Sequence, residues 1–105
     1  MQSEPKRAAT ALDKLLARYR TDILRIAAEY GAENVRVFGS MARGDDRPDS
    51  DLDLLVVFRP GRSLLDHCGL MLDLQDLLGR KVDVTSERAL HWYIRDQVIE
   101  EAVAI

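Results

Sequence analysis

The chain has 105 residues and a formal net charge of −3 at pH 7, and its balance of 47% hydrophobic and 31% charged residues is typical of a folded globular protein. The negative charge argues against a surface that coats nucleic acid, and no apolar run is long enough to span a membrane. The single cysteine, Cys68, excludes an internal disulfide and a metal site built from several cysteines.

The pattern of apolar residues predicts helices that alternate with short strands. Helices are expected over about 8–30, 40–43, 63–78 and 87–101, and strands over 34–38, 51–58 and 81–85. We therefore expect an α/β (α+β) fold in which a small mixed sheet of three strands is flanked by helices. The whole chain, 1–105, is expected to form one domain, and a cytoplasmic location is expected because the N-terminus lacks the apolar segment of a signal peptide.

Capping residues indicate where the predicted helices begin and end. Gly31 and Gly79 stand where a glycine commonly ends a helix. Asp66 follows Ser63 at the spacing of a capping box. The predicted N-caps are Ser40, Ser63 and Ser86. The apolar residues 102–105 are expected either to pack on this domain or to dock onto a partner.

Several side chains have simple structural interpretations. The histidines, His67 and His91, have no second ligand at metal-binding spacing, so we expect them at the surface or its boundary. Cys68 is expected to be a small buried residue. Trp92 and Tyr93 are adjacent on the last predicted helix, so at least one is expected in the core. The basic residues of the first helix are expected to form a solvated face: Lys14, Arg18, Arg20 and Arg25.

Two carboxylates open the second predicted strand. Asp51 and Asp53 are two residues apart, so their side chains share one face of the strand while Leu52 points the other way. Two adjacent carboxylates repel, and a hard cation such as Mg²⁺ removes that repulsion. Asp83 is a third acid, placed between valines in the next predicted strand. If the two strands are neighbours, three carboxylates converge, enough for two metal ions.

The segment before these acids suits a phosphate. Gly39 follows the first predicted strand and lets the backbone approach a phosphate closely. Ser40 adds a hydroxyl donor, and the start of the following helix offers free N–H groups. Arg43 lies one turn further on and is expected either to pair with phosphates or to form an ion pair within the next turn, with Asp45, Asp46 or Asp49.

These residues together carry a resemblance to a known family. The stretches GSMARG (39–44) and SDLDL (50–54) look like the signature of the polymerase-beta-like nucleotidyltransferase superfamily, and GRKVDV (79–84) fits its third motif. The short chain is similar to the minimal nucleotidyltransferases of bacteria and archaea, which are antitoxin partners of HEPN-domain ribonuclease toxins. No motif position departs from the pattern.

The resemblance implies a role for each motif residue. Asp51, Asp53 and Asp83 would be catalytic and would bind Mg²⁺, with two ions expected. Asp83 would also help to activate the acceptor hydroxyl. ATP would be the substrate, and the residues implied to bind it are Gly39, Ser40, Arg43 and Ser50.

The resemblance also implies a biological activity. The chain would be an antitoxin of a type VII toxin–antitoxin system that transfers AMP from ATP to a hydroxyl of its HEPN toxin, expected to be a tyrosine, and releases pyrophosphate. An open site on a small domain fits an acceptor that a partner protein supplies. The alternatives are an antitoxin that acts by binding and occlusion without catalysis, and a transferase that acts on a small molecule such as an aminoglycoside.

Overall fold

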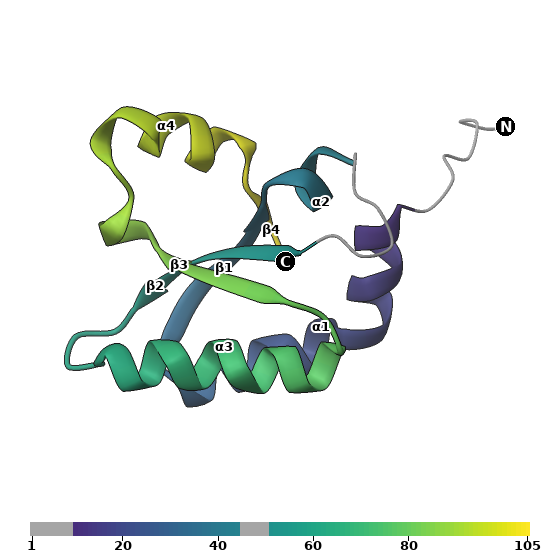
Figure 1. Ribbon diagram of the computed structural model, residues 1–105, viewed down its shortest axis with the longest axis horizontal. Coiled ribbons are helices and arrows are strands. Elements are labelled where there is room, and N and C mark those ends of the chain that lie inside the picture. The colour runs from purple at the N-terminus through teal and green to yellow at the C-terminus, as the bar shows by residue number, and fades with distance from the viewer. Residues whose placement is uncertain (1–9, 45–50) are drawn as a thin grey trace, which may run out of the picture.

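A computed structural model of the protein describes residues 10–44 and 51–105 (Figure 1). The four helices and the first three strands each fall near a segment that the apolar pattern predicts. The elements in chain order are α1 (Ala11–Glu29), β1 (Ala32–Phe38), α2 (Ser40–Arg43), β2 (Leu52–Phe58), α3 (Leu64–Leu78), β3 (Val82–Ser86), a 3₁₀ turn (Glu87–Ala89), α4 (Trp92–Glu101) and β4 (Val103–Ala104).

The four strands form one mixed sheet in the order β3-β2-β1-β4. β1 is antiparallel to both of its neighbours, β2 and β4, whereas β2 and β3 are parallel. The parallel pair is joined by α3, which is long enough to cross over the sheet. This order makes β2 a central strand and brings the end of β1 next to the start of β2.

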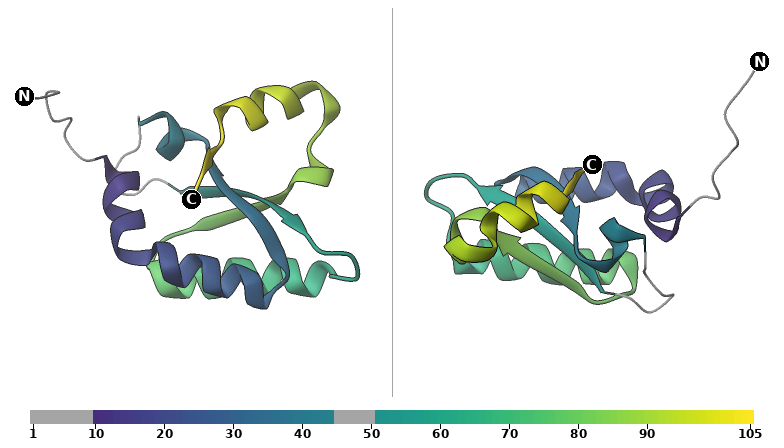
Figure 2. Two further views of the ribbon diagram at one scale, coloured as in Figure 1. Left: turned by 180° about the vertical axis from the view of Figure 1, so that it is seen from behind. Right: turned by 90° about the horizontal axis from the view of Figure 1, so that it is seen from above.

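The hydrophobic core lies between one face of the sheet and the helices α1 and α3. Strand side chains alternate between faces, so Leu52 and Leu54 of β2 and Val82 of β3 all point into this core and are fully buried. From α1 and α3 the core receives Ile23, Leu70 and Leu74. Figures 1 and 2 show α4 on the opposite side of the sheet from α3. The residues between the buried ones in each strand therefore face away from α1 and α3.

Local signals explain most of the helix ends. The predicted capping box of α3 is confirmed. The hydroxyl oxygen of Ser63 accepts a hydrogen bond from the backbone N–H of Leu65, and the backbone N–H of Ser63 donates one to the carboxylate of Asp66. Gly79 ends the same helix in the left-handed conformation, as predicted. α1 begins at Ala11 rather than near residue 8 because Thr10 and Asp13 form a second capping box.

Two predicted N-caps are wrong. Ser40 is the first residue of α2 and Gly39 is its N-cap. Ser86 ends β3, and a 3₁₀ turn follows it, so the last helix starts at Trp92 with His91 as its N-cap. α4 starts five residues later than predicted, and Trp92 and Tyr93 in its first turn are 81% and 72% exposed. The prediction that one of them lies in the core is wrong.

The sheet has a fourth strand that the apolar pattern did not predict. Val103 and Ala104 pair with Val37 and Arg36 of β1, and the backbone N–H of Ile105 donates to Val35. Residues 102–105 were expected either to pack on this domain or to dock onto a partner, and in the structure they pack on this domain. A two-residue strand is too short for alternation to reveal it.

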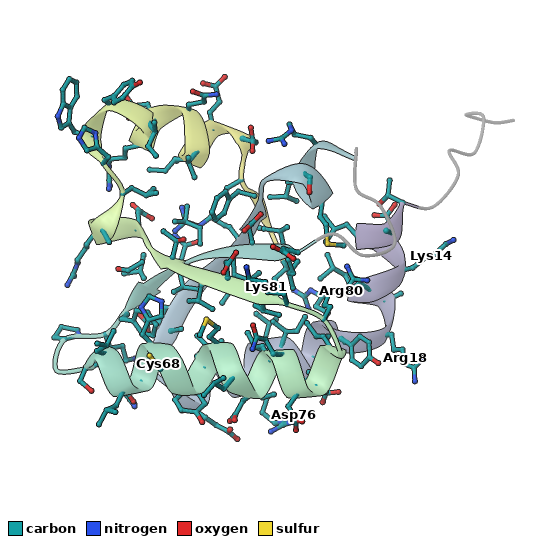
Figure 3. All side chains as sticks on the ribbon, in the orientation of Figure 1. Lys14, Arg18, Cys68, Asp76, Arg80 and Lys81 are labelled. Carbon is teal, nitrogen blue, oxygen red and sulfur yellow. The ribbon has the colours of Figure 1, made fainter. Side chains whose placement is uncertain are left out.

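The remaining expectations concern individual side chains and the membrane. The predicted basic face of α1 is exposed, and Figure 3 shows Lys14 and Arg18 directed away from the sheet. Cys68 is half-buried rather than buried. In the described part of the chain, no helix is long and apolar enough to cross a membrane.

Candidate functional site

The site predicted from the sequence lies where β1 ends beside the starts of β2 and β3. Gly39 follows β1 with φ +80° and ψ −155°, a conformation that only glycine adopts readily. A Cβ atom built on Gly39 would lie 2.4 Å from Oδ2 of Asp53, which is closer than non-bonded atoms can approach. The glycine is therefore needed twice, for its backbone angles and for the space that the carboxylate of Asp53 occupies.

The sheet register brings two of the predicted carboxylates side by side. Asp53 is the Cα partner of Asp83 across the parallel pair β2–β3, and of Phe38 across the antiparallel pair β1–β2. Partners in neighbouring strands direct their side chains to the same face. Since Leu52 and Val82 point into the core, Asp53 and Asp83 lie on the opposite face, which carries α4.

Asp51 precedes β2 and is closer to the rim of the site. Its Oδ2 lies 3.8 Å from Nζ of Lys81, and both side chains are largely exposed, so this ion pair is weak. Lys81 is a residue that the sequence reasoning missed, although it adjoins the strand that carries Asp83. Figure 3 shows Lys81 at the start of β3, next to the site.

The pKa of Asp53 reflects the charged residues around it. The pKa of Asp53 is raised, first by burial and then by the nearby carboxylates of Asp83 and Asp51, while Arg43 and Lys81 oppose the shift. The charged form of Asp53 is thus disfavoured until a cation compensates it. Both of the other predicted acids therefore lie close enough to Asp53 to act on its charge.

The donor set fits a hard divalent cation. Carboxylate oxygens are the ligands that Mg²⁺ prefers, and the pKa of Asp53 is raised first by burial and then by the two neighbouring acids. Across residues 10–44 and 51–105, however, no three acidic, histidine or cysteine side chains converge tightly enough to form a complete metal cluster. The pair Asp53 and Asp83 is therefore the best-defined part of the candidate metal site, with Asp51 at its edge.

The segment that the sequence predicts to bind phosphate contacts an acid that the sequence did not reveal. Oε1 of Glu101, the last residue of α4, accepts a hydrogen bond of 3.0 Å from the backbone N–H of Gly39 and one of 3.1 Å from Nη1 of Arg43. These donors are 62 and 58 residues away in the chain, so no local pattern could have linked them to Glu101. The ion pairs proposed for Arg43 with Asp45, Asp46 or Asp49 lie outside the described residues, as does Ser50.

An ion-pair network holds α4 over this face of the sheet. Glu87, in the 3₁₀ turn, pairs with Arg36 of β1 and with Arg95 of α4. Arg36 is only 8% exposed, so its charge depends on this partner. The network fixes one end of α4, and β4 fixes the other by pairing with β1.

Comparison with known proteins gives a consistent set of relatives. A family model described as a nucleotidyltransferase domain matches residues 20–105. MJ0435 of Methanocaldococcus jannaschii, assigned as a protein adenylyltransferase, is 37% identical over 83 residues, which are 79% of this chain and 89% of that protein. The protein adenylyltransferase MntA of Thermococcus cleftensis is 38% identical over 76 residues, which are 72% of this chain and 77% of that protein.

Solved structures agree with these sequence matches. A structure described as a minimal nucleotidyltransferase is 52% identical, with a TM-score of 0.81 over 94% of this chain and 100% of that one. A crystal structure of a toxin–antitoxin with AMP-PNP has a TM-score of 0.69 at 20% identity, over 80% of this chain and 69% of that one. At 20% identity, the similarity to the toxin–antitoxin structure shows only that the two chains share a fold.

Proposed function

This chain belongs to the nucleotidyltransferase domain family and is an enzyme of the minimal nucleotidyltransferase type, and we propose that it transfers AMP from ATP to a hydroxyl of a partner protein. In this proposal it is a cytoplasmic antitoxin of a type VII system. Its acceptor is a tyrosine of a cognate HEPN ribonuclease toxin, which the transfer silences. All of the chain, 1–105, acts as one domain.

The observation that carries this proposal is the register of Asp53 with Asp83 beside Gly39. Paired carboxylates next to a backbone that can approach a phosphate are what a metal-dependent transfer of a nucleotidyl group requires. The names of the two curated relatives support protein as the acceptor. The toxin–antitoxin structure with AMP-PNP, which shares the fold, supports a toxin partner and an adenine nucleotide.

Each residue has a role in the proposed reaction. Asp53 and Asp83, with Asp51, would hold Mg²⁺, of which we propose two ions. The metal, when bound, would stabilise negative charge on the phosphate and on the attacking and leaving oxygens. Ser40 and Ser50, together with the N–H of Gly39 and the guanidinium of Arg43, would hold the triphosphate.

The chemical step is an in-line displacement at the α-phosphorus of ATP. The tyrosine oxygen forms a bond to the α-phosphorus as the bond from that phosphorus to the bridging oxygen of the β-phosphate breaks. Pyrophosphate leaves with that oxygen, and Asp83 accepts the hydroxyl proton. Asp83 is suited to this role because it lies in register beside Asp53, on the face of the sheet opposite the core.

The experiment combines the purified chain with a cognate HEPN toxin, Mg²⁺ and ATP labelled at the α-phosphate. Label should pass to the toxin, and intact-mass measurement should show added AMP. Asp53→Ala should abolish transfer while the complex still forms. Asp76→Ala is a matched control, because Asp76 is an exposed residue of α3 that Figure 3 shows directed away from the sheet, and it should transfer normally.

The same experiment separates the alternatives. If Asp53→Ala neither transfers label nor loses the ability to neutralise the toxin, occlusion is the mechanism. If the chain alone adenylylates an aminoglycoside efficiently and leaves the toxin unlabelled, the proposed acceptor is wrong.

A further inference from the structure

We propose that Glu101 is an internal competitor of the nucleotide: its carboxylate occupies the donors that the triphosphate needs, and ATP must displace it. This inference rests on the proposed function, because it concerns the same Gly39 and Arg43. It assigns a role to a residue that lies outside the sequence motifs, at the end of α4.

The contacts of Glu101 resemble those of a bound phosphate oxygen. One anionic oxygen, Oε1, accepts from a backbone N–H at 3.0 Å and from a guanidinium at 3.1 Å. A backbone N–H has a single hydrogen, so Gly39 cannot serve Glu101 and a phosphate at the same time. A phosphate beside the carboxylate would also face a like charge. Binding of the triphosphate at Gly39 therefore requires Glu101 to move away.

The fold positions Glu101 for this competition. β4 begins two residues after Glu101, and its Val103 pairs with Val37 of β1, two residues before Gly39. The backbone on both sides of the contact is thus held at one edge of the sheet. Because β4 has only two residues and the side chain of Glu101 is 24% exposed, moving the carboxylate need not open the core.

The expected size of the effect follows from the contacts that the competitor makes. A partly exposed ion pair and one charge-assisted hydrogen bond favour the closed arrangement modestly. When only a fraction of the molecules is competent to bind, the apparent affinity falls by that fraction, so removal of Glu101 should tighten MgATP binding by roughly 3- to 10-fold.

The test is calorimetric titration of the full chain with MgATP, in the wild type and in Glu101→Ala. Glu100→Ala is a matched control, because it removes the same charge from the neighbouring, exposed position of α4. Glu101→Ala should bind several-fold more tightly than both. Glu101→Gln keeps the size of the side chain and serves if the alanine variant folds poorly. It should fall between the wild type and Glu101→Ala, since an amide oxygen is a weaker, uncharged acceptor.

The outcomes distinguish the two proposals. Equal affinity in the wild type and Glu101→Ala, or weaker binding in the variant, overturns the competitor role and leaves the proposed transferase intact. If Glu100→Ala binds MgATP as tightly as Glu101→Ala, the competitor role is also overturned, because the increase in affinity would then come from the loss of any negative charge near the site. If no variant binds MgATP, the proposed function itself fails, and the inference fails with it.

Discussion

The carboxylate of Asp53 lies so close to the backbone of Gly39 that a Cβ atom added at position 39 would fall 2.4 Å from Oδ2. The loop that we propose to bind phosphate and the strand that we propose to bind metal are therefore in direct contact. A substitution at Gly39 should therefore alter the position of the Asp53 carboxylate, and a substitution at Asp53 should alter the tolerance for a side chain at position 39.

Gly39→Ala should unfold more easily and bind MgATP poorly. Gly44→Ala is the control, since Gly44 also has a φ of +80° but has nothing within 4 Å of an added Cβ. We expect Gly44→Ala to lose about 1 kcal/mol and Gly39→Ala roughly 1–3 kcal/mol more, because it adds a forbidden ψ and a clash. Chemical unfolding and calorimetry measure both effects.

A double-mutant cycle isolates the clash. If the contact with Asp53 is the cause, Gly39→Ala should be less damaging in a chain that already carries Asp53→Ala. Strict additivity would show that only the backbone angles matter at this position.

Asp53→Asn should stabilise the protein when no metal is present. Burial and two neighbouring acids disfavour the charge of Asp53, so its removal relieves repulsion across β2 and β3. A like-charge pair of this kind costs about 0.2–1 kcal/mol, which corresponds to a rise in Tm of about 1–6 °C. Thermal unfolding in EDTA measures this gain.

Magnesium should reverse that order of stability. Mg²⁺ should raise the Tm of the wild type and have little effect on Asp53→Asn, because binding to the native state alone is stabilising. A wild type that does not respond to millimolar Mg²⁺ in the presence of ATP would contradict the proposed metal site.

The central motif could be read from the sequence because its geometry is local. Alternation along a strand places Asp51 and Asp53, and a glycine after a strand is a recognisable signal for a phosphate. The neighbour relation of Asp53 and Asp83 was conditional, because no local rule decides which strands pair. Glu101 could not be found at all, since its contacts depend on where α4 and β4 finally lie.

Glu87→Gln should destabilise the protein at neutral pH. Arg36 and Arg95 bind the carboxylate and hold the pKa of Glu87 below its ordinary value of 4.5. The loss should be about 1–3 kcal/mol at pH 7, because the buried charge of Arg36 loses its partner. Urea unfolding curves measure the difference.

The pH dependence gives this prediction a second readout. A lowered folded pKa contributes stability above the unfolded pKa, and this contribution is lost as pH falls through the folded value. The difference in the free energy of unfolding between wild type and Glu87→Gln should therefore shrink toward zero well below pH 4.5. If this difference stays constant as the pH falls, the loss of stability comes from side-chain packing at position 87 and not from the charge of Glu87.

Trp92→Ala should leave stability within about 0.5 kcal/mol of the wild type, because the side chain is 81% exposed. Trp92 is the sole tryptophan, so the fluorescence of the folded chain should already resemble that of exposed tryptophan. Iodide quenching before and after unfolding checks this directly. A large loss of stability would show that Trp92 packs in the core, contrary to its exposure in the structure.

The errors at the end of the chain have one physical origin. The adjacent aromatic residues Trp92 and Tyr93 suggested a core contact, but a 3₁₀ turn follows β3, the helix starts only at Trp92, and both side chains are exposed. Val103 and Ala104 form a strand only because β1 offers an unpaired edge. Both features depend on tertiary contacts that propensity does not encode.

The pairing of Asp53 with Asp83 also protects the sheet against misassembly. Side chains alternate between faces, so a slip of β3 by one residue would bury Asp83 beneath α3 and expose Val82 and Val84. An unpaired carboxylate in that apolar core would cost several kcal/mol, far more than a slipped ladder of five short pairs could recover. Asp83, to which we assign a role in the proposed reaction, therefore also favours the correct alignment of the parallel strands.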